Sequence, residues 1–323
     1  MNEKIDFKLG DCVACGSKKS KFMFKSTEIR HGMGGMWDLY CCATCGLMRI
    51  FPFPKNISKY YPKDYTAYYE YKTSEVPNYK KLAMKRHYGY LHLNTKSSLS
   101  EILKSEFYFI YSKINMSRII PFRKGLLFDV GAGVGEFLES HRNLGWVVAG
   151  IDFSKHACKI AKKHDLDVFL GDYLEFNLKK KATVVNATFI LEHLFDPNAF
   201  FFKTYSILEN NGLLVFDVPN AKSVDLLLFK NNCYSLDSPR HLFVYSSKSL
   251  ELMLMRNGFK IKKILYPTNP FHFVKSINLW LHKKGIKFQF APSNKLFYIF
   301  TIPFSLLHRS SEITVYAEKI NGF

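Results

Sequence analysis

Short apolar runs alternate with helix-like segments through the second part of this chain, and this alternation constrains the fold more than any other feature. After Lys124 the apolar runs lie at 126–130, 147–151, 168–170, 184–187 and 213–218. Segments with helical character separate most of them, at 136–143, 155–164 and 198–208, and two late strands are expected at 260–266 and 312–317. Strands that alternate with helices predict a mostly parallel sheet with helices on both faces.

A glycine-rich loop follows the first of these runs. Asp129 lies near the end of the run, and Gly131, Gly133 and Gly135 follow at every second position before a helix. Glycine lets the backbone approach a ligand that side chains would keep away. The third glycine comes one residue too early for the GxGxxG loop of dinucleotide enzymes. The Asp129 carboxylate also suits a cationic amino group better than a pyrophosphate.

Two further acidic residues stand at the ends of the next two strands. Asp152 ends the second strand, where a carboxylate can accept hydrogen bonds from both hydroxyls of a ribose. Asp172 follows the third run and is placed to accept a hydrogen bond from an adenine amino group, with Phe153 and Tyr173 as candidates to flank the ring. Each acid alone is also compatible with a turn or a helix cap. Three acids at three strand ends favour a nucleoside site.

Two CxxCG motifs near the N terminus predict a metal site, and 26 residues lie between Cys15 and Cys42. The four predicted ligands are Cys12, Cys15, Cys42 and Cys45. Four thiolates complete a closed tetrahedral zinc site without an open position for chemistry, so the expected role of the zinc is structural. Cys41 and His31 lie nearby but outside the CxxC spacing, and we do not assign them. Four unligated thiols are the alternative.

Residues 125–220 resemble class I S-adenosylmethionine-dependent methyltransferases. The motifs that continue the pattern of one large subgroup, with its LEHL-x-DP signature, are ILEHLFDP (190–197), FDVPN (216–220), SPRHL (238–242) and NGF (257–259). Together with the two CxxCG motifs and the stretch YYPKDY at 60–65, they resemble zinc-containing methyltransferases of bacterial sugars and surface polysaccharides, including sugar C-methyltransferases.

The resemblance implies a Rossmann-like α/β fold: a seven-stranded, mostly parallel sheet with helices on both faces, preceded by a small zinc ribbon and a helical cap. We expect a zinc-ribbon module at 1–55, a linker and helical cap at 56–124, and a class I methyltransferase domain at 125–323. The implied cofactor is S-adenosylmethionine, in addition to the structural zinc. Thr183 and the pair Thr188-Phe189 depart from the subgroup's pattern, which leaves the substrate-facing residues open.

Two histidines are candidates for the chemistry. His193 follows the fourth strand, at the crevice where such sheets bind ligands, and the resembling sugar enzymes place a histidine base in this motif. The alternative is that His193 only hydrogen-bonds the loop beside Asp196, which is the expected cap of the next helix. His241 is the second candidate. Its neighbour Arg240 is expected to bind a phosphate or carboxylate of the substrate.

The charge of the chain and the resemblance together suggest its partners. A formal net charge of +19 favours anionic partners. The expected substrate is a small molecule of polysaccharide biosynthesis, either a nucleotide-sugar or a glycan. An RNA methyltransferase and a non-catalytic scaffold that binds the cofactor are the alternatives, although the sequence contains no recognised RNA-binding module. The oligomeric state is open.

The longest apolar run, at 296–307, is too short to span a bilayer and contains Pro303. A buried helix is the favoured interpretation, and peripheral contact with a membrane surface is the second. Residues 1–20 carry charges where a secretory signal needs an apolar stretch, so a cytoplasmic location is expected.

Overall fold

A seven-stranded sheet forms the centre of the molecule in the computed structural model, which describes residues 10–61, 71, 75–292 and 295–323. Its strands are β4 (Leu126–Val130), β5 (Val147–Asp152), β6 (Val168–Leu170), β7 (Ala182–Thr188), β8 (Leu208–Pro219), β10 (Phe259–Leu265) and β11 (Glu312–Lys319). The order across the sheet is β10-β11-β8-β7-β4-β5-β6. Only β11 runs antiparallel to its neighbours in this sheet, β8 and β10. The predicted Rossmann-like fold is confirmed.

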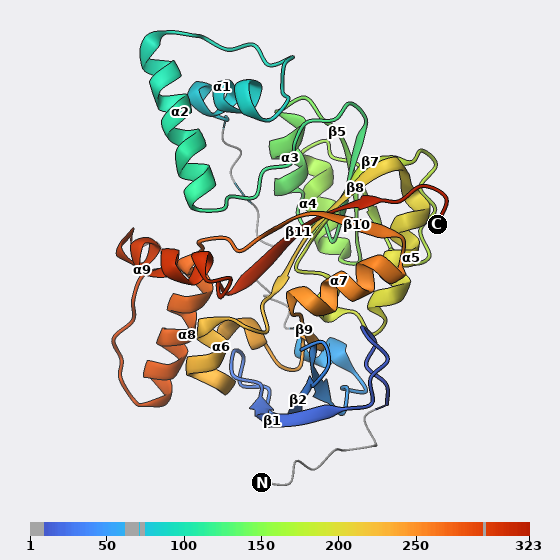
Figure 1. Cartoon of the computed structure of the whole chain (residues 1–323), viewed down its shortest axis with the longest axis vertical. Helices are drawn as coiled ribbons and strands as arrows, with labels where there is room; N and C mark the ends of the chain where they lie inside the picture. Colours follow the sequence, from blue (N-terminus) through green and yellow to red (C-terminus); the bar gives the residue numbers. More distant parts are fainter. Residues whose placement is uncertain (1–9, 62–70, 72–74, 293–294) are drawn as a thin grey trace.

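Helices cover both faces of this sheet (Figure 1). They are α3 (Glu136–Arg142), α4 (Lys155–Lys163), α5 (Pro197–Ile207) and α7 (Ser247–Arg256). Strand β4 shows how the two faces are divided, because successive side chains of a strand point to opposite sides. Phe128 belongs to the apolar cluster that contains side chains of α5 and α7, whereas Leu127 belongs to the cluster that contains side chains of α3 and α4.

A second sheet joins the N-terminal segment to the rest of the protein. It consists of β1 (Ser20–Thr27), β2 (Met36–Cys42), β3 (Met48–Phe51) and β9 (Phe243–Val244), in that order. Strand β9 comes from the distant 240s and pairs with β3 through Met48–Val244 and Arg49–Phe243. The N-terminal segment therefore shares both a sheet and an apolar cluster with the methyltransferase-like part.

Two helices form a cap at the top of Figure 1. They are α1 (Asn78–His87) and α2 (Leu99–Ile114), where the sequence has helical periodicity. The Ser98 side chain caps α2 by accepting a hydrogen bond from the Glu101 N–H. A short 3-10 helix, Ile57–Tyr60, precedes them, and the rest of the YYPKDY stretch from Pro62 onward lies outside the described residues.

A pair of helices, α8 (Pro270–Lys283) and α9 (Lys295–Leu306), is inserted between β10 and β11. The sequence predicted a buried helix over 296–307. The helix is present, but its burial was predicted wrongly, since Leu296 is 68% and Ile299 69% exposed. The reason is that α9 packs on α8 over one side only and no described element covers its other side. Among the described residues, no helix is both long and apolar enough to cross a bilayer.

Candidate functional site

The glycine loop after β4 turns tightly, and its glycines adopt backbone conformations that other residues rarely adopt. Gly131, Gly133 and Gly135 all have left-handed φ angles, of 72°, 55° and 90°. A Cβ atom on Gly131 would lie 2.2 Å from the Ile190 Cδ1 atom. The Gly131 and Ala132 N–H groups both donate to the Ile151 carbonyl at the end of β5. The loop therefore follows the carboxyl edge of the sheet closely, as a cofactor loop requires.

Two predicted acids lie beside this loop. The Asp152 carboxylate accepts hydrogen bonds from the Gly133 and Ser154 N–H groups, both at 2.8 Å. The Asp129 carboxylate accepts a hydrogen bond of 2.6 Å from the Asn186 side-chain amide. Burial raises the pKa of Asp129 to about 7, against the opposing effect of that hydrogen bond. A cationic ligand group at this position would favour the ionised form of Asp129.

The other predicted nucleoside contacts divide between the surface and the core. Phe153 is 69% exposed beside Asp152, so its ring is free to flank a base. The exposed Asp172 carboxylate accepts a hydrogen bond from the Leu174 N–H, which is a local turn contact. Tyr173 is instead buried, with its hydroxyl 2.8 Å from the Thr204 hydroxyl. The prediction that Tyr173 flanks the adenine is therefore wrong, because its ring packs in the core against Phe200.

The fold brings His193 and His241 together, although they are far apart in sequence. Their ring centroids are 4.7 Å apart in an edge-to-face arrangement. His193 ends the 3-10 turn Leu191–His193, which follows β7. This turn is fixed to the 240s, since the Leu242 N–H donates to the Glu192 carbonyl at 2.7 Å and the Tyr245 hydroxyl donates to the Leu191 carbonyl.

Both imidazoles use the same nitrogen to contact the backbone. His193 Nδ1 lies 3.0 Å from the Arg240 carbonyl, and His241 Nδ1 lies 2.8 Å from the Ser235 carbonyl. A carbonyl only accepts, so each Nδ1 carries the proton and each Nε2 keeps its lone pair. Burial lowers the pKa of His193, and it lowers the pKa of His241 to about 3. Two neutral histidines, whose Nε2 atoms form no hydrogen bond with the described residues, therefore stand at the carboxyl edge of the sheet.

Glu192, between these histidines, is a site residue that our sequence reasoning missed. It is fully buried, and neither carboxylate oxygen has a hydrogen-bond partner among the described residues. Its Oε1 lies 3.9 Å from His241 Nε2. Burial raises the pKa of Glu192 well above its usual value. The sequence signal for Glu192 is its place in the LEHL motif, directly before His193.

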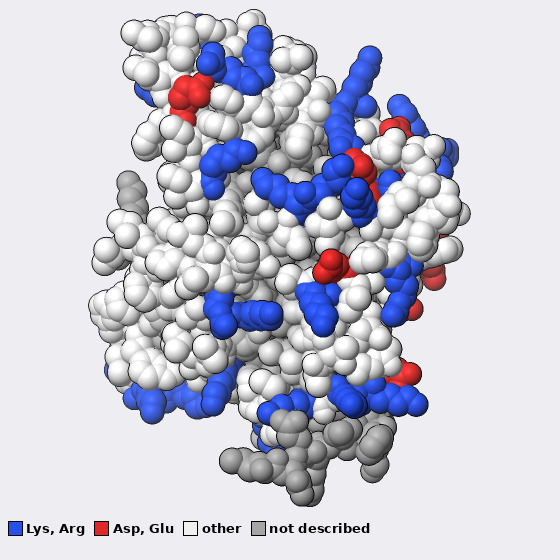
Figure 2. Space-filling model, in the orientation of Figure 1, with Lys and Arg blue, Asp and Glu red and all other residues white. Residues whose placement is uncertain are grey.

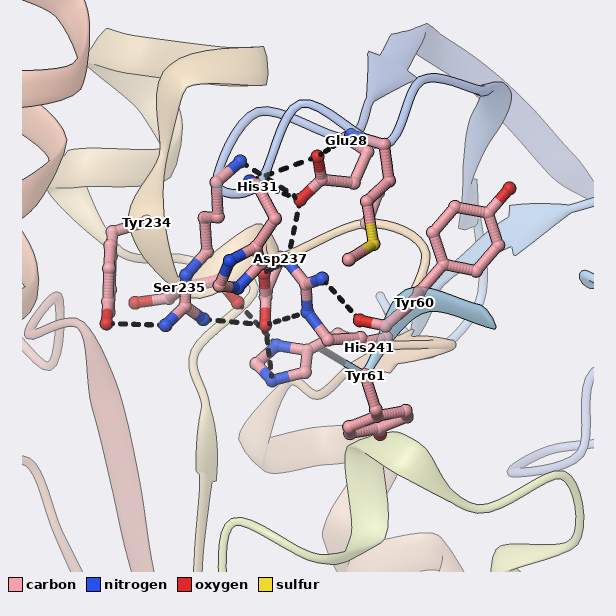
Figure 3. A network of polar contacts seen from close by, with 12 residues as sticks. Glu28, His31, Tyr60, Tyr61, Tyr234, Ser235, Asp237 and His241 are labelled. Carbon is pink, nitrogen blue, oxygen red and sulfur yellow. Dashed lines mark hydrogen bonds and ion pairs between the residues drawn. The ribbon is translucent and has the colours of Figure 1, made fainter. Parts of the chain in front are cut away.

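Arg240 does not face the substrate site, contrary to our prediction. It is fully buried, and its guanidinium donates to Asp237, to Glu28 at 2.9 Å and to the Tyr60 carbonyl at 2.8 Å. Figure 3 shows Glu28 and Asp237 converging on one network, with His241 next to Asp237. Because Nε, Nη1 and Nη2 of Arg240 already donate to these groups, the guanidinium has no pair of N–H groups left to bind an anion. It is a structural residue that ties the loop before His241 to the N-terminal segment.

Asp237 is the acid at the centre of this network. It also accepts a hydrogen bond of 2.7 Å from Arg30, whose second amino group donates to the Tyr234 hydroxyl. Burial alone would raise the pKa of Asp237, but the hydrogen bonds and positive charges of Arg240 and Arg30 lower it to about 2. Asp237 is therefore an ionised, fully paired acid.

The four predicted cysteine ligands lie together in the N-terminal segment. The Sγ atoms of Cys12 and Cys45 are 3.6 Å apart, as are those of Cys15 and Cys42, and all four lie within 4.8 Å of one another. A zinc ion with Zn–S bonds of about 2.3 Å requires separations near 3.8 Å, so the four thiols fit this ion. Cys41 is outside the cluster, as the spacing predicted.

Backbone hydrogen bonds shape both cysteine motifs in the same way. The Gly16 N–H donates to the Cys12 carbonyl at 2.8 Å, and the Gly46 N–H donates to the Cys42 carbonyl at 2.9 Å. Both glycines are left-handed, with φ angles of 72° and 77°. Each motif is thus a tight knuckle that turns its two thiols in one direction.

Comparison with known proteins agrees with this geometry. The profile of a family described as "methyltransferase domain" matches residues 109–264. The mitochondrial ubiquinone biosynthesis O-methyltransferase of Schizosaccharomyces pombe is 35% identical over 98 residues, which cover 28% of this chain and 36% of the relative. The ubiquinone biosynthesis O-methyltransferase of Glaesserella parasuis is 26% identical over 176 residues, covering 49% of this chain and 73% of the relative.

Solved structures with a similar arrangement include an S-adenosylmethionine-dependent methyltransferase from Archaeoglobus fulgidus. It is 19% identical, has a TM-score of 0.44, and the match covers 68% of this chain and 94% of that chain. This chain spans about a third of the length of the Schizosaccharomyces pombe relative. The strand order, the acids beside the glycine loop and the profile match lead to one conclusion: the chain carries a class I S-adenosylmethionine-dependent methyltransferase domain.

Proposed function

We propose that this protein transfers the methyl group of S-adenosylmethionine to an oxygen atom of a small acceptor that lies against His193 and His241. The observation that carries the proposal is the pair of neutral imidazoles at the carboxyl edge of the sheet, whose Nε2 atoms no described residue binds by a hydrogen bond. Parallel α/β sheets bind their ligands at this edge. The matched relatives are O-methyltransferases by name, which supports oxygen as the acceptor atom.

S-Adenosylmethionine supplies an activated methyl group, so the protein has to align the two reactants and exclude water. Asp129 is placed to meet the ammonium group and Asp152 the ribose, while Phe153 offers a face to the adenine. His193 is the candidate base that removes the acceptor proton, with His241 beside it. These roles follow from position at the strand ends.

The acceptor that we favour is a sugar or a surface-glycan intermediate. The sequence resemblance supports it, and the net charge of +19 suits a nucleoside diphosphate. An intermediate of ubiquinone biosynthesis is the second candidate, because the names of the matched relatives point to that pathway. Action in the cytoplasm stays a prediction.

Methyl transfer from labelled S-adenosylmethionine tests this function. The acceptor panel contains nucleotide-sugars, a cell glycan fraction and hydroxylated aromatic precursors of ubiquinone. We expect label in the sugar arm and a loss of roughly 10²–10⁴-fold in turnover for His193→Ala, the usual range for one positioned base. His156→Ala, an exposed histidine outside the site, is the control. Label only in the aromatic arm would select the second candidate, and label in no arm would contradict the proposal.

We further propose a structural zinc ion on the four clustered thiols and peripheral contact of α8 and α9 with an anionic membrane. The zinc is supported by the separations of the Sγ atoms. The membrane contact is supported by the exposed side chains of Trp280, Leu296 and Ile299, and by the exposed lysines 283, 284 and 287 at and just after the end of α8. At the lower left of Figure 2, where α8 and α9 lie in Figure 1, the surface is uncharged, and Lys and Arg side chains lie below it. Apolar and basic side chains in this arrangement suit a membrane interface.

A further inference from the structure

Glu192 is an anomaly in an otherwise well-paired interior. Among the described residues it is the one carboxylate with both oxygens buried and without a hydrogen-bond partner. Its side chain is fully buried. A buried carboxylate without partners is strongly unfavourable, so such a group normally has a cationic or hydrogen-bonding ligand. No protein group supplies one among the described residues.

The charges around Glu192 leave it unbalanced. Arg30 and Arg240 donate to Asp237, and Arg240 also donates to Glu28. Two guanidinium groups and two carboxylates cancel one another in this network. The Asp237 carboxylate is 3.9 Å from His241 Nε2 but is already paired with both arginines. Among the described residues no cation pairs with Glu192, so its carboxyl group is held protonated unless a cation binds.

Both histidines lie close to this carboxyl group, and His241 Nε2 is 3.9 Å from Glu192 Oε1. One donor atom each of Glu192, His193 and His241 lies within 4.8 Å of the other two. Both Nδ1 atoms are bonded to backbone carbonyls, which fixes the tautomer and leaves Nε2 as the ligand atom. Hydrogen bonding of the second ring nitrogen is the usual support of a metal-bound histidine.

We propose that Glu192, His193 and His241 bind one divalent transition-metal ion. Two histidines and one carboxylate are a common ligand set for such ions, and they leave open positions for water or a substrate. Bonds of about 2.1 Å require donor atoms roughly 3–3.5 Å apart, so side-chain movements of about 1 Å close the site. The backbone is already in place, because the Leu242 N–H holds the Glu192 carbonyl at 2.7 Å.

The ion deepens the proposed function, and its role in the reaction rests on that function. An acceptor hydroxyl bound at an open position has a lowered pKa. Its proton passes to water, the new O–CH₃ bond forms, and the sulfur keeps the electron pair of the broken C–S bond. His193 then acts as a metal ligand instead of a base. Binding of the ion itself does not depend on the reaction.

Mn²⁺ titration of the intact protein, followed by the electron paramagnetic resonance of free Mn²⁺, tests the site. Mn²⁺ prefers oxygen and nitrogen ligands, so it does not replace zinc on four thiolates. We expect one Mn²⁺ per chain, and at least about tenfold weaker binding in Glu192→Gln and in His241→Gln. Glu312→Gln is the matched control, since Glu312 is another buried carboxylate but bonds to Asn269. Its affinity for Mn²⁺ should equal that of the wild type.

Two further measurements separate this inference from the proposed function. S-Adenosylhomocysteine should raise the melting temperature of Glu192→Gln as it does for the wild type, which shows that the variant is folded. Binding of Mn²⁺ without methyl transfer to any acceptor would support the metal site and contradict the function. Methyl transfer that is unaffected by Mn²⁺, together with equal Mn²⁺ binding by the wild type and both variants, would overturn the metal site and leave the function standing.

Discussion

The two acids of the cofactor site differ in the hydrogen bonds that they accept, and their acid–base behaviour follows from this difference. Asp129 and Asp152 are both nearly buried at the carboxyl edge of the sheet. Burial raises the pKa of Asp152, and the two backbone N–H bonds that its carboxylate accepts oppose this shift. Asp129 has one amide partner, and burial raises its pKa to about 7. Asp129 is thus the cofactor-site acid whose charge changes within the physiological range.

This difference predicts a pH dependence of cofactor binding. Asp129 has to ionise to pair with an ammonium group, so affinity for S-adenosylhomocysteine should rise as the pH increases toward about 7 and level off above it. Calorimetric titration at several pH values measures it. Asp129→Asn should bind more weakly and with a flat profile, whereas the exposed control Asp167→Asn should keep the slope. A steep profile in Asp129→Asn would assign the ionisation to another group.

The same pKa predicts how stability changes with pH in the absence of ligand. A carboxyl whose pKa is raised on folding binds its proton more tightly in the folded state. Its contribution therefore favours the folded state below about pH 4, declines as the pH rises toward about 7, and is absent above that. Cofactor binding and stability should consequently respond to pH in opposite directions.

At the scale of elements, local patterns predicted most of the central sheet. The apolar runs at 126–130 and 168–170 coincide with β4 and β6, and the run of β4 is apolar throughout because this central parallel strand is buried on both faces. The glycine loop was predictable for a similar reason, as its left-handed φ angles require glycine. Burial of α9 was predicted wrongly, since an apolar run does not reveal whether another element covers it.

The cysteine knuckles predict one zinc ion per chain, measured by metal analysis of protein purified without chelator. Cys42→Ser should remove the zinc and unfold the N-terminal sheet, since metal binding and folding are coupled in so small a module. Cys158→Ser is the control, because Cys158 lies near β5 and β6, outside the four-thiol cluster. Metal-free protein with an intact N-terminal sheet would contradict a structural zinc.

The exposed face of α9 predicts binding to anionic vesicles. Wild-type protein should sediment with vesicles of phosphatidylglycerol and phosphatidylcholine, and less so at high salt, because apolar and basic groups both contribute. Leu296→Glu with Ile299→Glu should abolish this binding. Met255→Glu, at an exposed position on α7, should leave it unchanged. Sedimentation that is equal for all three proteins would place the contact elsewhere.

At the scale of the whole molecule, the N-terminal segment is built into the site instead of standing beside it. Strand β9 completes its sheet, and Glu28 bonds to Arg240, immediately before His241. Sequence reasoning could not find this pair, since the two partners are 212 positions apart and Glu28 belongs to no recognisable motif. For the same reason the sequence does not reveal that Arg240 is a structural residue.

This connection predicts that Glu28 stabilises the molecule. Glu28→Ala leaves part of a buried guanidinium without its partner, which should lower the free energy of unfolding by about 3–5 kcal/mol. Asp38→Ala breaks the Lys25–Asp38 pair, whose lysine is largely exposed, and should lower it by less than about 1 kcal/mol. Urea denaturation measures both. Equal effects would mean that the buried network does not hold the two sheets together.

Ligand-induced thermal stabilisation tests the central claim, the identity of the cofactor, most directly. S-Adenosylhomocysteine at 100 times its dissociation constant should add about 2.7 kcal/mol and raise the melting temperature, because it binds only the folded protein. NAD should cause no shift, and Asp152→Asn, which weakens a predicted ribose contact, should reduce the shift with S-adenosylhomocysteine. A shift with NAD and none with S-adenosylhomocysteine would contradict the account.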